Sequence, residues 1–173
     1  MSTVQVQNIN HTNGTSAITI DSSGNVNIPG HVIQTVTQNF TTSVSTTSTS
    51  FVATAVSVSI TPTSASNKIL ILGSVPIFAQ GITAGGHAVF SVFRGGVASG
   101  TNLGDAIFGT GQVYSSGGDN IVMLSLNHID SPATTSSVTY EIGIKRQNPS
   151  AIVTAQLAVN SEVYNLTVME IAQ

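Results

Sequence analysis

Cysteine is absent from this chain of 173 residues, and charged residues are scarce. Without thiols the chain can form no disulfide framework, thiolate metal site or cysteine nucleophile. Only 6% of the residues are charged, with four Lys and Arg, seven Asp and Glu and a formal charge of −3, against about 25% in a typical soluble domain. No basic stripe can neutralise phosphates, so we expect no nucleic-acid partner.

Long apolar runs and helical patterning are also missing. The longest apolar runs, 69–72 and 121–124, are far shorter than the about 20 residues of a membrane-spanning helix, so we expect no membrane insertion. The opening MSTVQVQNINH lacks a basic region followed by an apolar one, and we expect synthesis in the cytoplasm. No window of a dozen residues carries apolar side chains at helical spacing.

Apolar and polar residues instead alternate with period two, and turn residues separate the alternating runs. In 138–146, for example, Thr139, Glu141 and Lys145 share a polar face. The opposite face is apolar and expected in the core: Val138, Tyr140, Ile142 and Ile144. We expect eight strands, near residues 51–60, 68–78, 87–94, 105–108, 121–129, 138–146, 152–159 and 163–171. Eight short strands are typical of a sandwich or barrel, and the pattern predicts an all-β fold, an antiparallel β-sandwich with the eight strands of a jelly roll.

Three regions are expected along the chain. Residues 1–30 are predicted to form an extended β-rich N-terminal arm, with strands near 17–20 and 25–28 and a stop at Pro29 and Gly30. Residues 31–50 are interpreted as an extended connector and 51–173 as the head. Within the connector, TTSVSTTSTS (41–50) favours extended backbone lying on the head, the alternative being a flexible polar linker.

Three strings resemble one protein family: TPTSASNKILIL (61–72), DSPATTSSVTY (130–140) and MEIAQ (169–173). With the opening VQVQNINHTNGTSAITIDSSGNVNIPG (4–30), they are similar to the C-terminal β-domains of small virion proteins of tailed phages. The resemblance implies a homotrimer on the outside of a virus particle. The low charge is in keeping with such a subunit, because bare sheet edges are tolerated when neighbours cover them.

Two functions follow from the resemblance. In the first, the chain is a decoration or cement protein on the capsid surface, and its arm adds strands to the major capsid protein. The candidate contact residues of this arm are aliphatic: Val4, Val6, Ile9, Ile18, Ile20, Val26 and Ile28. In the second, the chain is the receptor-binding tip of a tail fibre, and exposed loops contact a host-surface glycan. The candidate contact residues of these loops are His87, Asn102, Tyr114 and Asp119.

No catalytic or metal-binding arrangement is indicated. The nucleophile-elbow pattern G-x-S-x-G is absent, and His128 and Asp130 are interpreted as a strand-end pair. The Gly-rich stretches 84–89 and 109–114 are interpreted as turns, because neither opens a helix after a strand. DSSGN (21–25) lacks the distant bidentate acid of a calcium loop and is interpreted as a hairpin turn. We expect no enzymatic activity, no metal and no cofactor.

Overall fold

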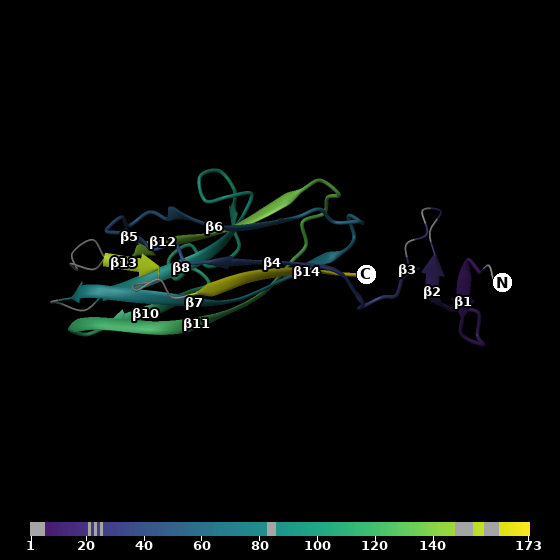
Figure 1. Cartoon of the computed structure of the whole chain (residues 1–173), viewed down its shortest axis with the longest axis horizontal. Coiled ribbons are helices and arrows are strands. Elements are labelled where there is room, and N and C mark those ends of the chain that lie inside the picture. The colour runs from purple at the N-terminus through teal and green to yellow at the C-terminus, as the bar shows by residue number, and fades with distance from the viewer. Residues whose placement is uncertain are drawn as a thin grey trace.

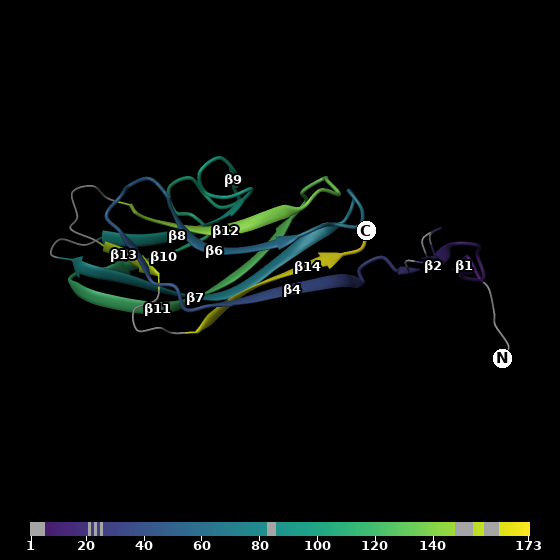
Figure 2. The ribbon, with the colours of Figure 1, turned by 45° about the horizontal axis from the view of Figure 1, so that its top comes forward.

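The computed structural model describes residues 6–20, 22, 24, 26–82, 86–147, 154–157 and 163–173. Every regular element in these residues is a strand, and every strand pair is antiparallel. Two sheets lie face to face in the head, and a small sheet lies beyond one end of it (Figures 1 and 2). The all-β, antiparallel prediction is therefore confirmed.

The small N-terminal sheet has the strand order β1-β2-β3, with β1 (Asn8–Asn10), β2 (Ser16–Ile20) and β3 (Val26–Asn27). One head sheet has the order β10-β8-β12-β6, and β9 also pairs with β8. Its strands are β6 (Val52–Ile60), β8 (Gly86–Arg94), β9 (Thr101–Asn102), β10 (Gly111–Ser115) and β12 (Val138–Arg146).

The other head sheet has the order β4-β14-β7-β13-β5, and β11 also pairs with β7. Its strands are β4 (Val32–Phe40), β5 (Val44–Thr46), β7 (Lys68–Ile82), β11 (Gly118–Asp130), β13 (Thr154–Leu157) and β14 (Tyr164–Ile171). β14 and β13 pair with successive parts of β7, while β11 pairs along the whole of its opposite side. We call the two the five-stranded and the six-stranded sheet.

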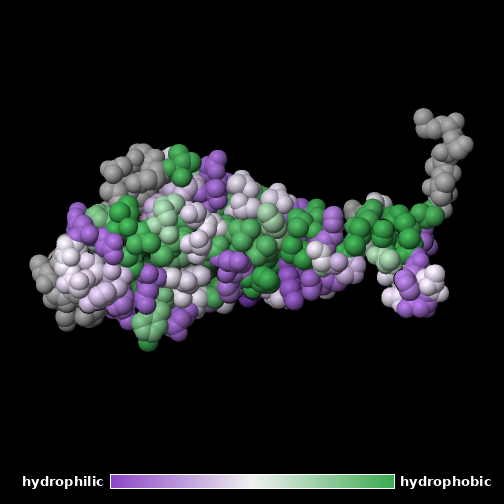
Figure 3. All heavy atoms as spheres, turned by 90° about the horizontal axis from the view of Figure 1, so that it is seen from below, coloured by the Kyte–Doolittle hydropathy of each residue, from purple (hydrophilic) through white to green (hydrophobic). Residues whose placement is uncertain are grey.

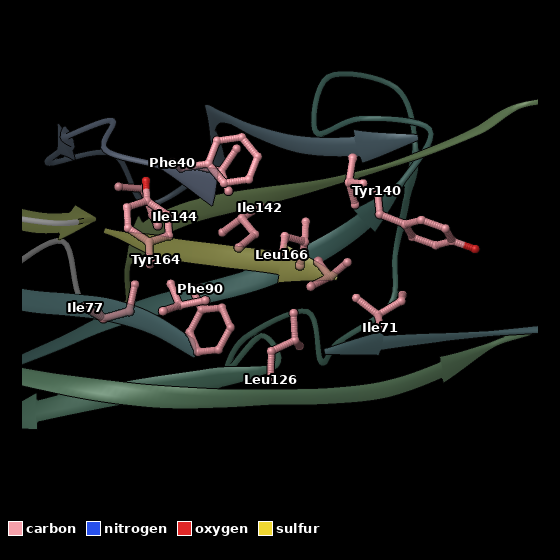
Figure 4. Close-up of a cluster of buried hydrophobic side chains, with 14 of the residues drawn as sticks. Phe40, Ile71, Ile77, Phe90, Leu126, Tyr140, Ile142, Ile144, Tyr164 and Leu166 are labelled. Carbon is pink, nitrogen blue, oxygen red and sulfur yellow. The ribbon is translucent and has the colours of Figure 1, made fainter. Parts of the chain in front are cut away.

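The core lies between these two sheets, where one face of each strand is apolar. The predicted face of β12 is confirmed, since Val138, Tyr140, Ile142 and Ile144 are all buried in it. Figure 4 shows side chains from both sheets converging there, with the Tyr140 hydroxyl directed away from the cluster. The core also takes in Phe40 from β4. Burial of this apolar surface is the main force that holds the two sheets together.

The outer face of the five-stranded sheet is covered as well, which the alternation of β12 did not indicate. Lys145 points away from the core, as predicted, yet its side chain is only 8% exposed. Its ammonium group lies 4.5 Å from the centre of the Phe51 ring and donates to the Ala106 carbonyl oxygen. Phe93 of β8 is buried on this outer face, where its ring packs edge-on against Phe51.

The structure differs from the sequence prediction in two places around the Gly-rich stretches. The strand expected at 105–108 is a tight turn, since Asp105 pairs with Gly109 across it. The turn expected over 109–114 is instead largely strand β10. Residues 111–115 pair with β8, and a side chain at Gly111 would collide with the Phe90 ring, 2.5 Å from a Cβ. Gly111 therefore reflects close packing and not a turn.

The expected connector, 31–50, pairs extensively with the head. β4 pairs with the whole of β14, and β5 pairs with β13. The head sheets therefore include β4 and β5, because main-chain hydrogen bonds to strands far along the sequence hold both segments extended. Two further predictions fall partly outside the described residues: the strand at 152–159, of which 154–157 form β13, and the turn at 21–25.

Candidate interaction surfaces

The N-terminal sheet carries most of the aliphatic residues expected to contact a partner. Ile9 lies directly opposite Ile18, and Ile20 lies directly opposite Val26. Because residues two apart on a strand share a face, Ile18 and Ile20 bring both pairs onto the same side of the sheet. We call these four residues the aliphatic face. Of the other candidates, Val6 is exposed, Ile28 is half-buried, and Val4 lies outside the described residues.

The aliphatic face is not used to pack against the head. Ile9 and Val26 are 49% and 51% exposed. Among the described elements, β1, β2 and β3 contact one another and make no extensive contact with any head strand. In the view from below in Figure 3, apolar residues cover much of this sheet. An apolar cluster of this kind, too small to form a core of its own, is typical of a surface that binds another protein.

Hydrogen bonds fasten residues 30 and 31, which follow the N-terminal sheet, to the end of the chain. The Gly30 N–H donates to the Ala172 carbonyl oxygen at 2.8 Å, and the Ala172 N–H donates to the His31 carbonyl oxygen at 2.9 Å. The Gln173 N–H donates to the side-chain oxygen of Asn67. The C-terminal MEIAQ string therefore forms the root from which the N-terminal sheet projects.

A buried carboxylate, Glu170, organises this root. Its side chain is fully buried, and its Oε1 accepts hydrogen bonds from the Thr63 N–H, the Thr63 hydroxyl and the Asn67 amide at 2.7, 2.9 and 2.7 Å. Its Oε2 accepts from the Gln34 amide at 2.6 Å. Burial disfavours the charged form, yet these hydrogen bonds outweigh it and lower the pKa of Glu170. The carboxylate thus joins β4, β14 and the turn between β6 and β7.

Asp130, weighed in the sequence as half of a pair with His128, belongs to a different network. It is 7% exposed and accepts hydrogen bonds from Arg94 at 2.9 Å and from the Tyr140 hydroxyl at 2.8 Å. Burial, and then the bond to Asp130, raises the pKa of Tyr140 far above its ordinary value. The Asp130 carboxylate is thus paired with Arg94 and hydrogen-bonded to Tyr140. Because Arg94 lies on β8 and Asp130 on β11, the pair is a structural ion pair between the two sheets.

The predicted loop contacts separate into two kinds. His87 and Tyr114 are neighbours on β8 and β10, with ring centres 4.8 Å apart, and Tyr114 is 53% exposed. The start of β8 and the end of β10, which carry these residues, lie at the end of the head opposite the N-terminal sheet (Figure 1). Asn102 of β9 is instead engaged within the head, where its side-chain oxygen accepts hydrogen bonds from the Ser91 hydroxyl of β8 and from the Gly104 N–H. Asp119 is exposed near the β10–β11 turn.

The sequence prediction missed an exposed apolar turn at 105–109. The Asp105 carboxylate accepts the N–H groups of Ile107 and Phe108, both at 2.8 Å. Asp105 and Gly109 also exchange two backbone hydrogen bonds, of 3.0 and 2.9 Å. Ile107 and Phe108 are 54% and 46% exposed at its tip. The available signal was Asp followed by Gly four residues later, which is typical of a side-chain-capped turn.

Within the part of the chain that the structure describes, no three His, Asp or Glu side chains lie close enough together to hold a metal ion. The same residues include no helix long and apolar enough to cross a membrane. Comparison with known proteins found no matching family model and no curated protein of significantly similar sequence.

Proposed function

We propose that this chain is a homotrimeric decoration or cement protein on the outside of a tailed-phage capsid, anchored by its N-terminal arm. The observation that carries the proposal is the aliphatic face of the N-terminal sheet, which projects beyond the head with Ile9 and Val26 half exposed. The location on a phage particle is inferred from the sequence resemblance to tailed-phage virion proteins. The major capsid protein is the partner that the arm contacts.

A small projecting sheet is suited to this task. Strand addition gives main-chain hydrogen bonds to a partner sheet, and an aliphatic face adds apolar contact. Neither requires charge, and the chain has little charge to desolvate. Three arms on one trimer bind with higher effective concentration than one arm, so weak single contacts suffice for stable decoration.

The jelly-roll assignment of the head is part of the same proposal and is supported by the strand order. β4 and β5 lie along one sheet edge, as do β9 and β10 along another, while β13 and β14 both pair with β7. Counting each such pair as one strand gives eight. One sheet then contains the first, eighth, third and sixth strands, and the other contains the fifth, fourth, seventh and second. This is the double Greek-key order of viral capsid and lectin domains.

A second candidate function, the receptor-binding tip of a tail fibre, is favoured by Tyr114. Its ring is half exposed beside His87 at the end of the head away from the N-terminal sheet. An exposed ring beside a hydrogen-bonding side chain is suited to stacking against a sugar, and this placement would direct it toward a host-surface glycan.

Immunogold labelling of intact particles distinguishes the two functions. Antibody to the head should decorate the whole capsid shell in many copies per particle if the protein is a decoration protein. Labelling confined to the tail would overturn the capsid proposal and support the fibre tip. Substituting Tyr114→Ala provides a second test, since it should abolish binding to host cells only in the tail-fibre case.

A further inference from the structure

One short segment, 28–31, joins the N-terminal sheet to the head. Among the described elements, β1, β2 and β3 make no extensive contact with any head strand, so packing does not set the direction in which this sheet projects. The segment is a tight turn, because the His31 N–H donates to the Ile28 carbonyl oxygen at 2.9 Å. Pro29 and Gly30, which has φ +80, stand at its two central positions, as in a type II turn. The turn has one preferred shape, and its attachment to the head decides where the sheet points.

The turn is attached to the head through Ala172. This residue accepts the Gly30 N–H and donates its own N–H to the His31 carbonyl oxygen. Ala172 is fully buried, but it follows β14, which ends at Ile171. Figures 1 and 2 show the C-terminus at the end of the head that faces the N-terminal sheet. Because the last residues of a chain are poorly ordered unless they are tied down, the direction of the sheet depends on what holds residues 172 and 173.

The side chain of Asn67 ties the chain end to the buried carboxylate of Glu170. Asn67 is 3% exposed, and its amide nitrogen donates to Glu170 Oε1 at 2.7 Å. Its amide oxygen accepts the Gln173 N–H at 3.2 Å. An ionised carboxylate only accepts hydrogen bonds, so Glu170 requires the nitrogen side of the Asn67 amide. The oxygen side must then face Gln173, and one buried amide with a single allowed orientation holds the last residue of the chain.

We propose that Asn67 is a positioning residue, which holds the N-terminal sheet in one direction relative to the head by fixing residues 172 and 173. Without this tie the chain end frays beyond Ile171, the bonds of Ala172 to the 28–31 turn are lost, and the sheet swings about the turn. The fixed direction concerns this chain alone. Its consequence rests on the proposed function: three arms gain effective concentration only when their geometry lets them engage one particle together.

Distances between two spin labels on the full chain test this proposal. The chain contains no cysteine, so labels attach only at introduced ones. Thr12→Cys places one label in the exposed turn between β1 and β2, and Thr135→Cys places the other at an exposed position of the head, between β11 and β12. Labelled chain is refolded with an excess of unlabelled chain, so that double electron–electron resonance measures the distance within one copy. The otherwise native chain should give a single narrow distance distribution.

Two substitutions of the last residue isolate the contact with Asn67. Gln173→Pro removes the N–H that donates to Asn67, whereas Gln173→Ala removes the same side chain and keeps that N–H. In the labelled chain Gln173→Pro should broaden the distribution and abolish its single maximum, and Gln173→Ala should leave it narrow. Asn67→Ala should broaden it in the same way. Because Gln173 is the terminal residue and only partly buried, Gln173→Pro keeps the test decisive even where Asn67→Ala fails to fold.

Gly109→Ala is the control for lost stability, since it strains a turn of the head that does not contact the root. It should leave the distribution narrow. A broad distribution in the native background would overturn the proposal, as would a narrow one in Gln173→Pro or a broad one in Gln173→Ala. None of these results bears on whether the N-terminal sheet binds capsids, which is tested by removing the sheet.

Discussion

Replacing Glu170 with Gln should loosen the root of the N-terminal sheet by a calculable amount. Gln has the same shape and keeps one oxygen, which can still accept the bonds from Thr63 and Asn67 in neutral form. Its new amide group, however, meets the amide group of Gln34, and both are donors. Gln34 cannot turn over without losing its 2.7 Å bond to the Thr61 carbonyl oxygen.

The expected loss follows from these contacts. A hydrogen bond to a charged group contributes about 1.5–3 kcal/mol, and a buried donor left unpaired costs a further ~1 kcal/mol or more. We therefore expect Glu170→Gln to lower the free energy of unfolding by about 2–4 kcal/mol, or the melting temperature by roughly 5–15 °C. Glu141→Gln is the matched control, since Glu141 is half-buried and accepts from the Val97 N–H at 2.8 Å. It should cost less than about 1.5 kcal/mol.

The dependence on pH gives an independent test of the same carboxylate. The folded-state pKa of Glu170 is lowered, so between that pKa and the unfolded value of about 4.3 the unfolded chain binds more protons. Its contribution to stability is present above that unfolded value and is lost as pH falls through the folded pKa. Urea unfolding at fixed protein concentration should show this acid loss in the native chain and a smaller one in Glu170→Gln. Equal stability of the two proteins at about pH 7 would refute the reasoning.

Three further predictions concern the head and the arm. Ile142→Lys should abolish soluble expression, because Ile142 is fully buried in the core, whereas Thr139→Lys on the opposite face should remain folded. Gly109→Ala should cost at least about 2 kcal/mol in urea unfolding, because Gly109 has φ +61 and a Cβ there would lie 2.1 Å from the Phe90 carbonyl oxygen. Gly117→Ala, with open space around it, should be neutral. Removing residues 1–29 keeps the Gly30 bond to Ala172 and should leave the melting temperature nearly unchanged.

The alternation of apolar and polar residues predicted the buried side chains correctly wherever one face of a strand packs into the core and the other does not. The face of β12 could be predicted residue by residue, since Tyr140 and Ile142 meet the opposite sheet while Thr139 does not. The strand prediction failed at 105–108, where three apolar residues, 106–108, follow Asp105. There the Asp105 carboxylate accepts two backbone N–H groups and closes a turn. Such a side-chain hydrogen bond competes with strand pairing, and the hydropathy pattern does not indicate it.

Features that depend on contacts between residues far apart in the sequence could not be predicted from it. Residues 31–50 were predicted to be extended, with 41–50 lying on the head, but their assembly into strands β4 and β5 of the six-stranded sheet depends on β14 and β13. The root of the N-terminal sheet brings Gln34, Thr63 and Asn67 to Glu170. Strands β2 and β3 of the arm could be predicted, because each is a short alternating run beside a turn. The gathering of aliphatic side chains on one face of the arm depends on the register of its three strands.

Binding to particles that lack the native protein tests the attachment role of the N-terminal sheet most directly. The full chain and the chain without residues 1–29 are each added to such particles, and bound protein is measured after the particles are sedimented. The full chain should bind in high copy and raise the particles' resistance to heat, while the truncated chain should stay in the supernatant although it remains folded. Equal binding of both chains would contradict the account and place the attachment site in the head.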